Sequence, residues 1–291
     1  MRNRYAIRDL NNRLDATTDA QQITRNLSVY EYPWLLRHAL EFALFRTYAV
    51  PTISALLDRS GQFNGSGQKR YDDTSLIIAE IVENGYDSDR GRTAIRRMNQ
   101  LHRRFTISND DYLYVLSTFT FEPHRWVERF GWRPFTENEQ AAGFVFWSEV
   151  GRRMNTKDIP PTVEAFEAFN IAYEREHFHY TPSNERVGAA TVEVFASWYP
   201  VFTRPMVRES IYALLDDPLR EAFGFPKPSS AVIALAERGL KLRGQMIRRF
   251  FPPRKSPFLL TEAPNRTYPQ GYALTKLGPD DAPPMEQEQS A

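Results

Sequence analysis

Apolar residues recur along most of the chain at the three- and four-residue intervals of amphipathic helices. Residues spaced in this way lie on one face of a helix. We find no series of alternating strands, no hairpin turn framed by strand patterns and no internal repeat. The pattern predicts a single all-α domain of roughly eight to ten helices. The clearest stripes are Leu35, His38, Phe42 and Phe45; Ile95, Met98, His102 and Phe105; Phe166, Phe169 and Tyr173; and Val187, Ala190, Thr191, Val194 and Trp198.

Local signals mark where several of these helices begin and end. Ser108-x-x-Asp111 and Thr136-x-x-Glu139 predict capping boxes, in which each side chain satisfies a free backbone amide of the first turn. Gly85 follows an apolar run and is a predicted C-cap, because glycine tolerates the backbone conformation that ends a helix.

The chain divides into one helical domain with two flanking segments. The domain is expected at residues 28–251, between an N-terminal extension (1–27) and a C-terminal tail (252–291). The tail is Pro-rich and irregular, and its end is acidic and Gln-rich, so we interpret it as a flexible extension outside the core. Within the domain, Pro51 predicts a helix break, and residues 61–69 form a Gly-rich loop that lacks the ending of a phosphate loop.

Composition excludes several classes of protein. The 291 residues include 42% apolar residues, which is enough for a core and too many for a disordered chain. Positive and negative residues nearly balance, at 37 against 36, which argues against a nucleic-acid-binding protein. The chain has no cysteine, so Cys-bound zinc, iron–sulfur clusters, thiolate-ligated haem and Cys nucleophiles are excluded.

Targeting signals are not evident in the sequence. Residues 1–20 are charged and polar and do not resemble a signal peptide, and no apolar run reaches the roughly 18 residues of a membrane span. We therefore expect a cytoplasmic protein. Residues 238–255 contain basic and apolar residues but no acidic one, so this segment either lies on an anionic membrane or docks its apolar residues on the core. Docking on the core is the commoner arrangement.

Two histidines lie within apolar helical stripes. His102 shares its face with Met98 and Phe105, and His38 lies in an equally apolar stripe. A haem needs an imidazole on its iron, apolar walls and arginines near its propionates. The pattern alone does not choose between the two, and either one could instead be a core histidine bonded to a backbone carbonyl. Four arginines project from the other faces of the His102 helix: Arg96, Arg97, Arg103 and Arg104.

Other candidate chemistry is weaker. Glu174-x-x-His177 matches the Glu-x-x-His motif of di-iron bundles, but such sites need two copies of the motif and we find one. His124 follows a proline, which favours a structural or surface role. The motifs of zinc peptidases, serine hydrolases and dinucleotide-binding enzymes are missing from the sequence.

Several short motifs in a fixed order resemble a known family. They are residues 70–74 (RYDDT), 92–102 (RTAIRRMNQLH), 107–114 (ISNDDYLY), 130–133 (FGWR) and 158–160 (DIP). The first two resemble the catalytic domain shared by latex-clearing proteins, which are rubber oxygenases, and MpaB-type oxygenases. The later motifs are similar to the MpaB-like bacterial branch in particular. The resemblance covers residues 29–226.

The resemblance implies an all-α fold around a b-type haem with one histidine as the iron ligand. Arg70 and Thr74 match an Arg-x-x-x-Thr element of the family, and His102 then falls at the position of the iron ligand. This choice of His102 over His38 comes from the family. Met98 would then form part of the haem pocket with Phe105. Arg70 would anchor a propionate or polarise oxygen, and Thr74 would donate a hydrogen bond to oxygen or orient a water molecule.

One departure from the family concerns the residue before this threonine. Latex-clearing proteins carry a lysine there, and this chain has Asp73. A carboxylate accepts hydrogen bonds and donates only when protonated, so we expect Asp73 to manage a proton. The implied function is a haem-dependent oxygenase that uses O2 on a small apolar substrate, either isoprenoid or lipid-like. One alternative is a carrier or sensor of haem or another apolar ligand that turns over no substrate, with His38 or His177 as a second ligand of a bound haem iron. The other is a non-haem iron protein using Glu174 with His177.

Overall fold

The structure is a computed structural model that describes residues 3–61, 63, 65–283 and 285. This part of the chain contains thirteen α-helices and no strand, which confirms the predicted all-α fold. The expected number of helices was too low, because α1, α2 and α12 have only six or seven residues and are too short for a periodic stripe. The α-helices are α1 (Ala6–Asn11), α2 (Ala20–Asn26), α3 (Pro33–Thr47), α4 (Pro51–Arg59), α5 (Gly67–Asn84), α6 (Asp89–His102), α7 (Asn109–Phe130), α8 (Glu137–Arg153), α9 (Val163–His177), α10 (Pro182–Ser197), α11 (Arg204–Leu214), α12 (Asp217–Phe223) and α13 (Ser230–Phe250). Short turns of π or 3-10 helix lie at Leu27–Glu31, Val201–Thr203 and Leu274–Lys276.

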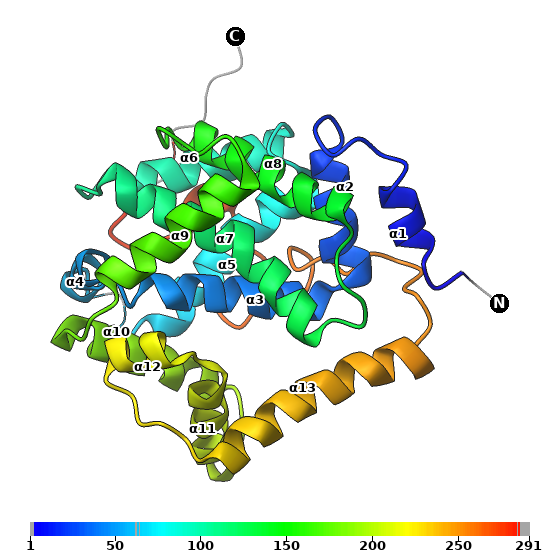
Figure 1. Ribbon diagram of the computed structural model, residues 1–291. Helices are drawn as coiled ribbons and strands as arrows, with labels where there is room; N and C mark the ends of the chain where they lie inside the picture. Colours follow the sequence, from blue (N-terminus) through cyan, green and yellow to red (C-terminus); the bar gives the residue numbers. More distant parts are fainter. Residues whose placement is uncertain (1–2, 62, 64, 284, 286–291) are drawn as a thin grey trace.

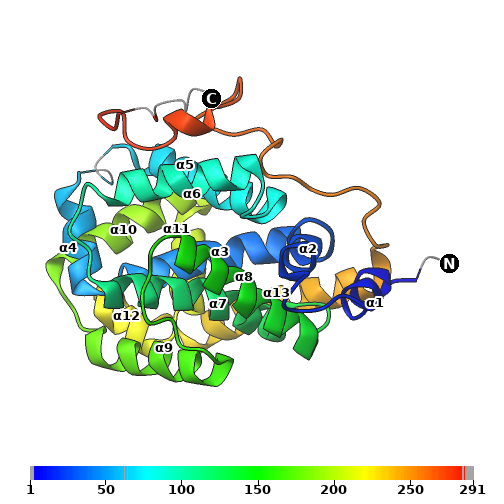
Figure 2. The ribbon, with the colours of Figure 1, turned by 90° about the horizontal axis from the view of Figure 1, so that it is seen from above.

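Helices α3 and α7 pack along each other at the centre of the molecule (Figure 1). Phe42 of α3 contacts Trp126 of α7 with 4.5 Å between the ring centroids, and Phe45 one turn further along α3 is fully buried. Helices α5 and α6 form a layer on one side of this pair (Figure 2). Helix α13 closes the opposite side by packing on α11 and α7.

The predicted helix ends are largely confirmed. Helix α4 begins at Pro51, and its axis is bent by 94° from that of α3. Gly85 ends α5 with a backbone φ of 83°, a conformation that favours glycine. Thr136 forms the complete capping box, whereas Ser108 forms half of one: its hydroxyl accepts from the backbone amide of Asp111, but that carboxylate turns elsewhere.

The N-terminal segment is part of the packed body. Ile23 of α2 is fully buried in the largest apolar cluster, where α2 packs on α8. The side-chain amide of Asn11 donates to Glu139 at 3.0 Å, which joins α1 to the start of α8. The segment that the sequence suggested as an extension therefore contributes to the core.

The interpretation of the C-terminal tail as a flexible extension outside the core is wrong for the described residues. From Pro252 the chain turns back and runs over α5 and α6 (Figure 2). Leu277 is 1% exposed and belongs to the largest apolar cluster. The hydroxyl of Thr267 donates to Asp72 at 2.5 Å, and Thr261 donates to Glu83 at 2.6 Å. The composition hid this docking because polar contacts, rather than an apolar stripe, fasten much of the segment.

Two further expectations concern loops and spans. The predicted loop at residues 61–69 lies between α4 and α5, although α5 already begins at Gly67, and residues 62 and 64 lie outside the described part.

Among the described helices, none is by itself long and apolar enough to cross a membrane. Helices α3 and α4 reach that length and composition only when taken together, across their sharp bend.

Candidate functional site

A large cavity lies between α3, α4, α5, α6, α7 and α8. Its volume is about 880 Å³, which is within the usual range for sites that bind cofactors and small molecules. Aliphatic and aromatic side chains form most of its wall. Each of the six predicted site residues lines this cavity: Arg70, Asp73, Thr74, Met98, His102 and Phe105.

One face of α5 supplies the polar wall of the cavity. Arg70, Asp73 and Thr74 lie at the start of this face, and Ile77 and Ile81 continue it one and two turns later. These positions are three or four residues apart and therefore share one side of the helix. The Arg-x-x-x-Thr element of the sequence thus lies on one face of α5, with Arg70 in the first turn of the helix.

The α5–α6 hairpin brings His102 opposite Arg70. The helical segments from Arg70 to the end of α5 and from the start of α6 to His102 are each about 20 Å long, so the chain returns to its starting level. Gly91 makes the hairpin tight, because a Cβ added there would lie 1.9 Å from the carbonyl oxygen of Gly85. Thr74 and His102 are far apart in the sequence, but the hairpin brings both to the wall of one cavity.

His102 has the properties of a metal-binding imidazole. Its ring lines the cavity and packs edge-on against Tyr112 at 5.7 Å. Burial, together with the charge of Arg70, lowers the pKa of His102 to about 4, so the ring is neutral at pH 7. Among the described residues, its buried Nδ1 has no hydrogen-bond partner. Neutral imidazole is the form that binds metals.

Three arginines line the same cavity. Arg70 lies with its guanidinium 5.0 Å from the ring centre of Phe63, and its buried Nε has no partner in the described part of the chain. Arg104 pairs with Asp281, whereas Arg59 makes no hydrogen bond or ion pair to any described residue. Guanidinium groups in such positions suit carboxylates such as the propionates of a haem.

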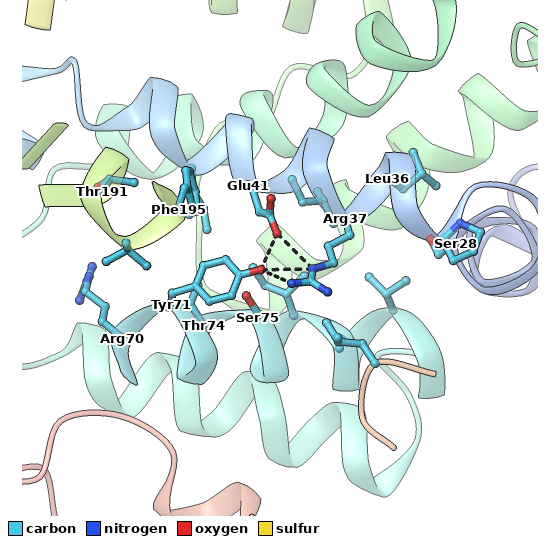
Figure 3. Close-up of a pocket in the computed structure, with 18 of the residues that line it drawn as sticks. Ser28, Leu36, Arg37, Glu41, Arg70, Tyr71, Thr74, Ser75, Thr191 and Phe195 are labelled. Carbon is cyan, nitrogen blue, oxygen red and sulfur yellow. Dashed lines mark hydrogen bonds and ion pairs between the residues drawn. The ribbon is translucent and has the colours of Figure 1, made fainter. Parts of the chain in front are cut away.

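Thr74 lies at the boundary between the cavity and a smaller groove of about 110 Å³. The groove runs between α3 and α5, and Figure 3 shows Arg37, Glu41 and Tyr71 grouped along it. Arg37 donates to the hydroxyl of Tyr71 at 2.8 Å, and this hydroxyl donates to the Glu41 carboxylate. The residues that line both spaces are Leu44, Tyr48, Arg70, Thr74 and Ile78.

Asp73 is held by two neighbours at the cavity wall. The residue is 5% exposed. Its Oδ2 accepts from the Lys69 ammonium at 3.0 Å, and its Oδ1 accepts from the hydroxyl of Tyr268. Burial and this bond to Asp73 raise the pKa of Tyr268. Asp73 thus anchors the C-terminal segment, whose Gly278 closes part of the cavity wall.

One of the four arginines near His102, Arg97, has a different role from the one that the helical pattern suggested. Arg97 is fully buried, and it donates to the carbonyl oxygens of Leu277 and Pro283 at 2.6 Å each. It therefore fastens the C-terminal segment and does not line the cavity. The helical pattern shows on which face of α6 an arginine lies. It does not show that residues about 180 positions further along the chain cover that face.

His38 lies away from the cavity. Its Nδ1 is 2.5 Å from the carboxylate of Glu41, and its ring packs on Trp34 at 4.2 Å. It lines neither the cavity nor the groove. The structure therefore separates the two histidines that the apolar pattern could not distinguish.

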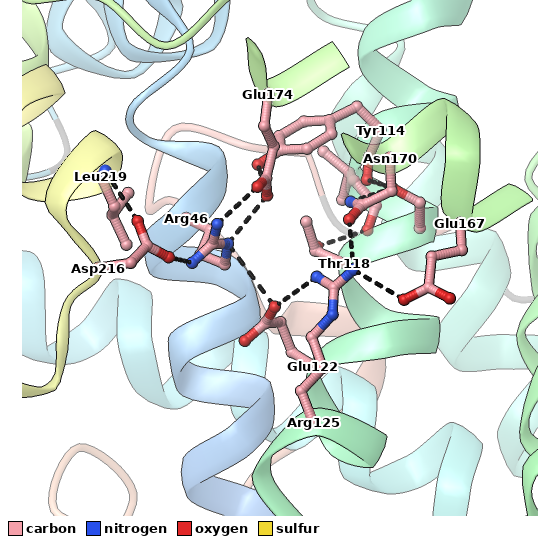
Figure 4. A network of polar contacts seen from close by, with 12 residues as sticks. Arg46, Tyr114, Thr118, Glu122, Arg125, Glu167, Asn170, Glu174, Asp216 and Leu219 are labelled. Atoms are coloured by element: carbon pink, nitrogen blue, oxygen red, sulfur yellow. Dashed lines mark hydrogen bonds and ion pairs between the residues drawn. The ribbon is translucent and has the colours of Figure 1, made fainter. Parts of the chain in front are cut away.

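Glu174 belongs to a network of ion pairs (Figure 4), whereas His177 packs on an aromatic ring. Glu174 accepts two hydrogen bonds from Arg46 at 2.6 and 2.9 Å and one from Tyr114 at 3.0 Å. His177 stacks on Tyr173 with 4.0 Å between the ring centroids, outside the cavity. The described residues contain no group of three or more His, Asp or Glu side chains that could hold a metal ion.

This arrangement contradicts two of the alternatives drawn from the sequence. The non-haem iron site at Glu174 would need carboxylates that are already committed to Arg46. The carrier with a saturated iron would need His38 or His177 at the cavity, and neither lines it.

The sequence analysis missed Asp111 and Tyr112 as cavity residues. Asp111 is buried and accepts from the hydroxyls of Thr52 at 2.9 Å and Tyr173 at 2.7 Å. The signal for this position was the capping motif at Ser108, which explains an acid at the helix start but not its inward direction.

The donor set fits a haem. The cavity combines one neutral imidazole that has a buried nitrogen without a partner, apolar walls and arginines at the rim. A buried polar atom without a partner marks a place where another group completes the site. A bare metal ion would need more ligands than this one histidine, whereas a porphyrin brings four nitrogens of its own.

The fold and site define the class of protein: an all-α domain that encloses one histidine in a large apolar cavity. Residues 42–246 match the family described as "ER-bound oxygenase mpaB/B'/Rubber oxygenase, catalytic domain". The chain belongs to this family.

Curated relatives from fungi support the assignment. The chain is 30% identical over 254 residues to "ER-bound oxygenase mpaB'" of Penicillium brevicompactum, covering 81% of this chain and 60% of the relative. It is 31% identical over 222 residues to "ER-bound oxygenase mpaB" of Penicillium roqueforti (strain FM164), covering 70% of this chain and 74% of the relative. A third relative, "ER-bound oxygenase mpaB" of Penicillium brevicompactum, is 32% identical over 200 residues, which are 62% of this chain and 51% of the relative.

Proposed function

We propose that this protein is a haem b-dependent oxygenase that acts on an apolar, isoprenoid or lipid-like substrate with O2. The observation that carries the proposal is the neutral imidazole of His102, which faces a cavity of about 880 Å³ and has a buried nitrogen without a partner among the described residues. Membership of an oxygenase family supports it independently.

His102 would hold the haem iron, and Met98 and Phe105 would contact the porphyrin. Haem iron bound through one histidine supplies the chemistry of O2 activation. Arg70 would neutralise a propionate or direct a hydrogen bond into the cavity. Without a bound group, the buried Nε of Arg70 has no hydrogen-bond partner in the described chain, which is unfavourable for the free energy of folding.

The residues of α5 would control hydrogen bonding and protons at the cavity wall. Thr74 can donate a hydroxyl hydrogen bond or orient a water molecule at the boundary with the groove. Asp73 accepts hydrogen bonds from the Tyr268 hydroxyl and the Lys69 ammonium, so it would act as the acceptor end of a short hydrogen-bonded chain at the cavity wall.

The groove beside Thr74 would receive an elongated apolar substrate. Leu44 and Ile78 line both the groove and the cavity, which gives an apolar chain a continuous surface. The polar group of Arg37, Glu41 and Tyr71 would orient a hydrogen-bonding end of the substrate (Figure 3).

The test is the absorption spectrum of the purified protein and of two single-histidine variants, with a pyridine haemochrome assay. The wild type is expected to bind b-type haem, and His102→Ala is expected to lose it while circular dichroism shows an unchanged helical fold. Imidazole added to His102→Ala should restore part of the binding, because the substitution leaves space for a free ligand.

His38→Ala is the matched control, since His38 also lies in an apolar stripe but outside the cavity. It should keep full haem content. Full haem loading of His102→Ala would refute the ligand assignment, and a wild type that stays colourless with excess haem would refute haem dependence.

A further inference from the structure

Helix α13 exposes a line of apolar side chains. Leu235, Leu242, Met246 and Phe250 are spaced by seven and then four residues, which places them along one side of the helix. Leu235 and Phe250 each keep 72% of their surface exposed, and Leu242 keeps 57%. A contiguous apolar stripe of this kind on a folded protein marks a surface that binds something.

The opposite side of α13 is the one that packs on the protein. Gly244 lies half a turn from the stripe and is buried, and a Cβ added there would be 2.7 Å from the carbonyl oxygen of Phe130 in α7. Leu240 and Ile247 pack on the main apolar cluster. The docking of this segment on the core therefore uses these residues and leaves the stripe uncovered.

Several cations of α13 and of the segment just after it make no internal hydrogen bond or ion pair, and Arg238 and Arg249 among them lie beside the stripe. No hydrogen bond or ion pair joins any of these five side chains to a described residue: Arg238, Arg248, Arg249, Arg254 and Lys255. The one acidic residue of α13, Glu237, already pairs with Arg129 and Lys241. The exposed surface therefore carries an uncompensated positive charge beside its apolar line. Apolar and basic residues arranged in this way are typical of helices that lie in a membrane interface.

An aromatic residue contacts α13, and a short exposed turn precedes a helix that packs on it. The guanidinium of Arg243 lies 3.8 Å from the ring centre of Trp34, and tryptophan is enriched where a protein meets lipid headgroups. Helix α11 packs on α13 (Figure 1), and the turn before it exposes Val201 and Phe202, the latter at 86%.

We propose that α13 docks the protein on an anionic phospholipid membrane, with the stripe of Leu235, Leu242, Met246 and Phe250 in the lipid and the flanking cations at the headgroups. A second copy of the chain is a less suitable occupant. A symmetric dimer through this stripe would bring the uncompensated cations of both copies together.

The experiment is co-sedimentation of the full chain with vesicles of phosphatidylcholine mixed with phosphatidylserine, and with vesicles of phosphatidylcholine alone. The protein should bind the anionic vesicles, and high salt should weaken this binding. The double variant Arg238→Gln/Arg249→Gln removes the two arginines beside the stripe and should lower the partition coefficient about thirtyfold. Leu242→Ser/Phe250→Ser should lower it at least about tenfold.

Ile171→Ser and Arg175→Gln on α9 are matched controls, because both side chains are exposed on another helix. They should bind vesicles as the wild type does, and circular dichroism should show all variants folded. The assay involves neither haem nor substrate, so its outcome is independent of the proposed function.

Two outcomes would overturn the proposal. One is vesicle binding that the α13 variants leave unchanged. The other is a failure to bind vesicles together with a dimer, seen by sedimentation velocity, that Leu242→Ser/Phe250→Ser dissociates.

Discussion

The titration of His102 couples the chemistry of the site to the stability of the protein. Its pKa is lowered on folding from 6.5 to about 4, mainly because the ring is buried, with the charge of Arg70 as a second cause. In this range the unfolded chain binds a proton that the folded protein excludes. The free energy of unfolding therefore falls as the pH drops from 6.5 to 4, and above 6.5 this contribution is constant.

We expect the haem-free protein to lose about 2 kcal/mol of stability through His102 between pH 7 and pH 5. The measurement is urea unfolding at both pH values for the wild type and for His102→Gln, which cannot take up the proton. The wild type should lose more stability than the variant. Equal losses would mean that His102 titrates normally in the folded protein.

Arg70→Gln separates the two causes of this shift. Removing the nearby positive charge should raise the pKa of His102 slightly, whereas burial should keep it below 6.5. The pH range over which the free energy of unfolding changes through His102 should therefore be narrower in Arg70→Gln than in the wild type.

At the residue scale, the candidate site was predictable only through the family resemblance. The apolar pattern treated His38 and His102 alike, and the motif at Arg70 and Thr74 selected His102. All of these residues except His38 line one cavity. Their roles towards haem and oxygen stay predictions. One partner of Asp73, Tyr268, could not be foreseen, because it is 195 residues further along the chain.

Among the elements, the α5–α6 hairpin is the one on which the site depends. It returns the chain so that the end of α6 faces the start of α5, and Gly91 allows the close approach. The hairpin therefore sets the position of His102 relative to Arg70.

Gly91→Ala is expected to lower the free energy of unfolding by about 3 kcal/mol or more, because its Cβ would collide with the backbone of Gly85. Gly143→Ala is the control, since it lies within α8 and its Cβ would meet nothing within 4 Å. That variant should be more stable than the wild type by up to about 1 kcal/mol. Urea unfolding measures both, and similar stabilities for the two variants would contradict the tight hairpin.

Helix ends were predictable to the extent that they depend on neighbouring residues. Thr136 and Glu139 satisfy each other's backbone amides within one turn, as the motif predicts. Ser108 caps its helix, but Asp111 instead accepts from Thr52 and Tyr173. The same motif therefore gives a complete or a half box, according to whether the tertiary structure offers the acid a better donor.

At the scale of the whole molecule, the C-terminal segment completes both the core and the cavity wall. Leu277 enters the main apolar cluster, and Gly278 lines the cavity. The buried Arg97 and the Asp73 carboxylate hold this segment against α6 and α5. Closure of the candidate site thus requires contacts of α5 and α6 with a segment 180 to 195 residues further along the chain.

Leu277→Ala should lower the free energy of unfolding by about 2–5 kcal/mol, as for other leucines buried in a core. Phe251→Ala is the control, because that ring is 55% exposed just after α13. It should change stability by no more than about 0.5 kcal/mol. Denaturant unfolding of both variants is the measurement, and a neutral Leu277→Ala would show that the segment does not pack on the core in solution.

The sequence by itself determined the helical class, the break at Pro51, the cap at Gly85 and the family. These features depend on interactions among residues within about four positions, or on short motifs in order. Only the tertiary structure decided which of the candidate residues share one cavity, how the C-terminal segment docks and which side of α13 remains exposed. The physical reason is that each of these depends on packing between helices far apart in sequence, and a helical stripe does not specify its partner.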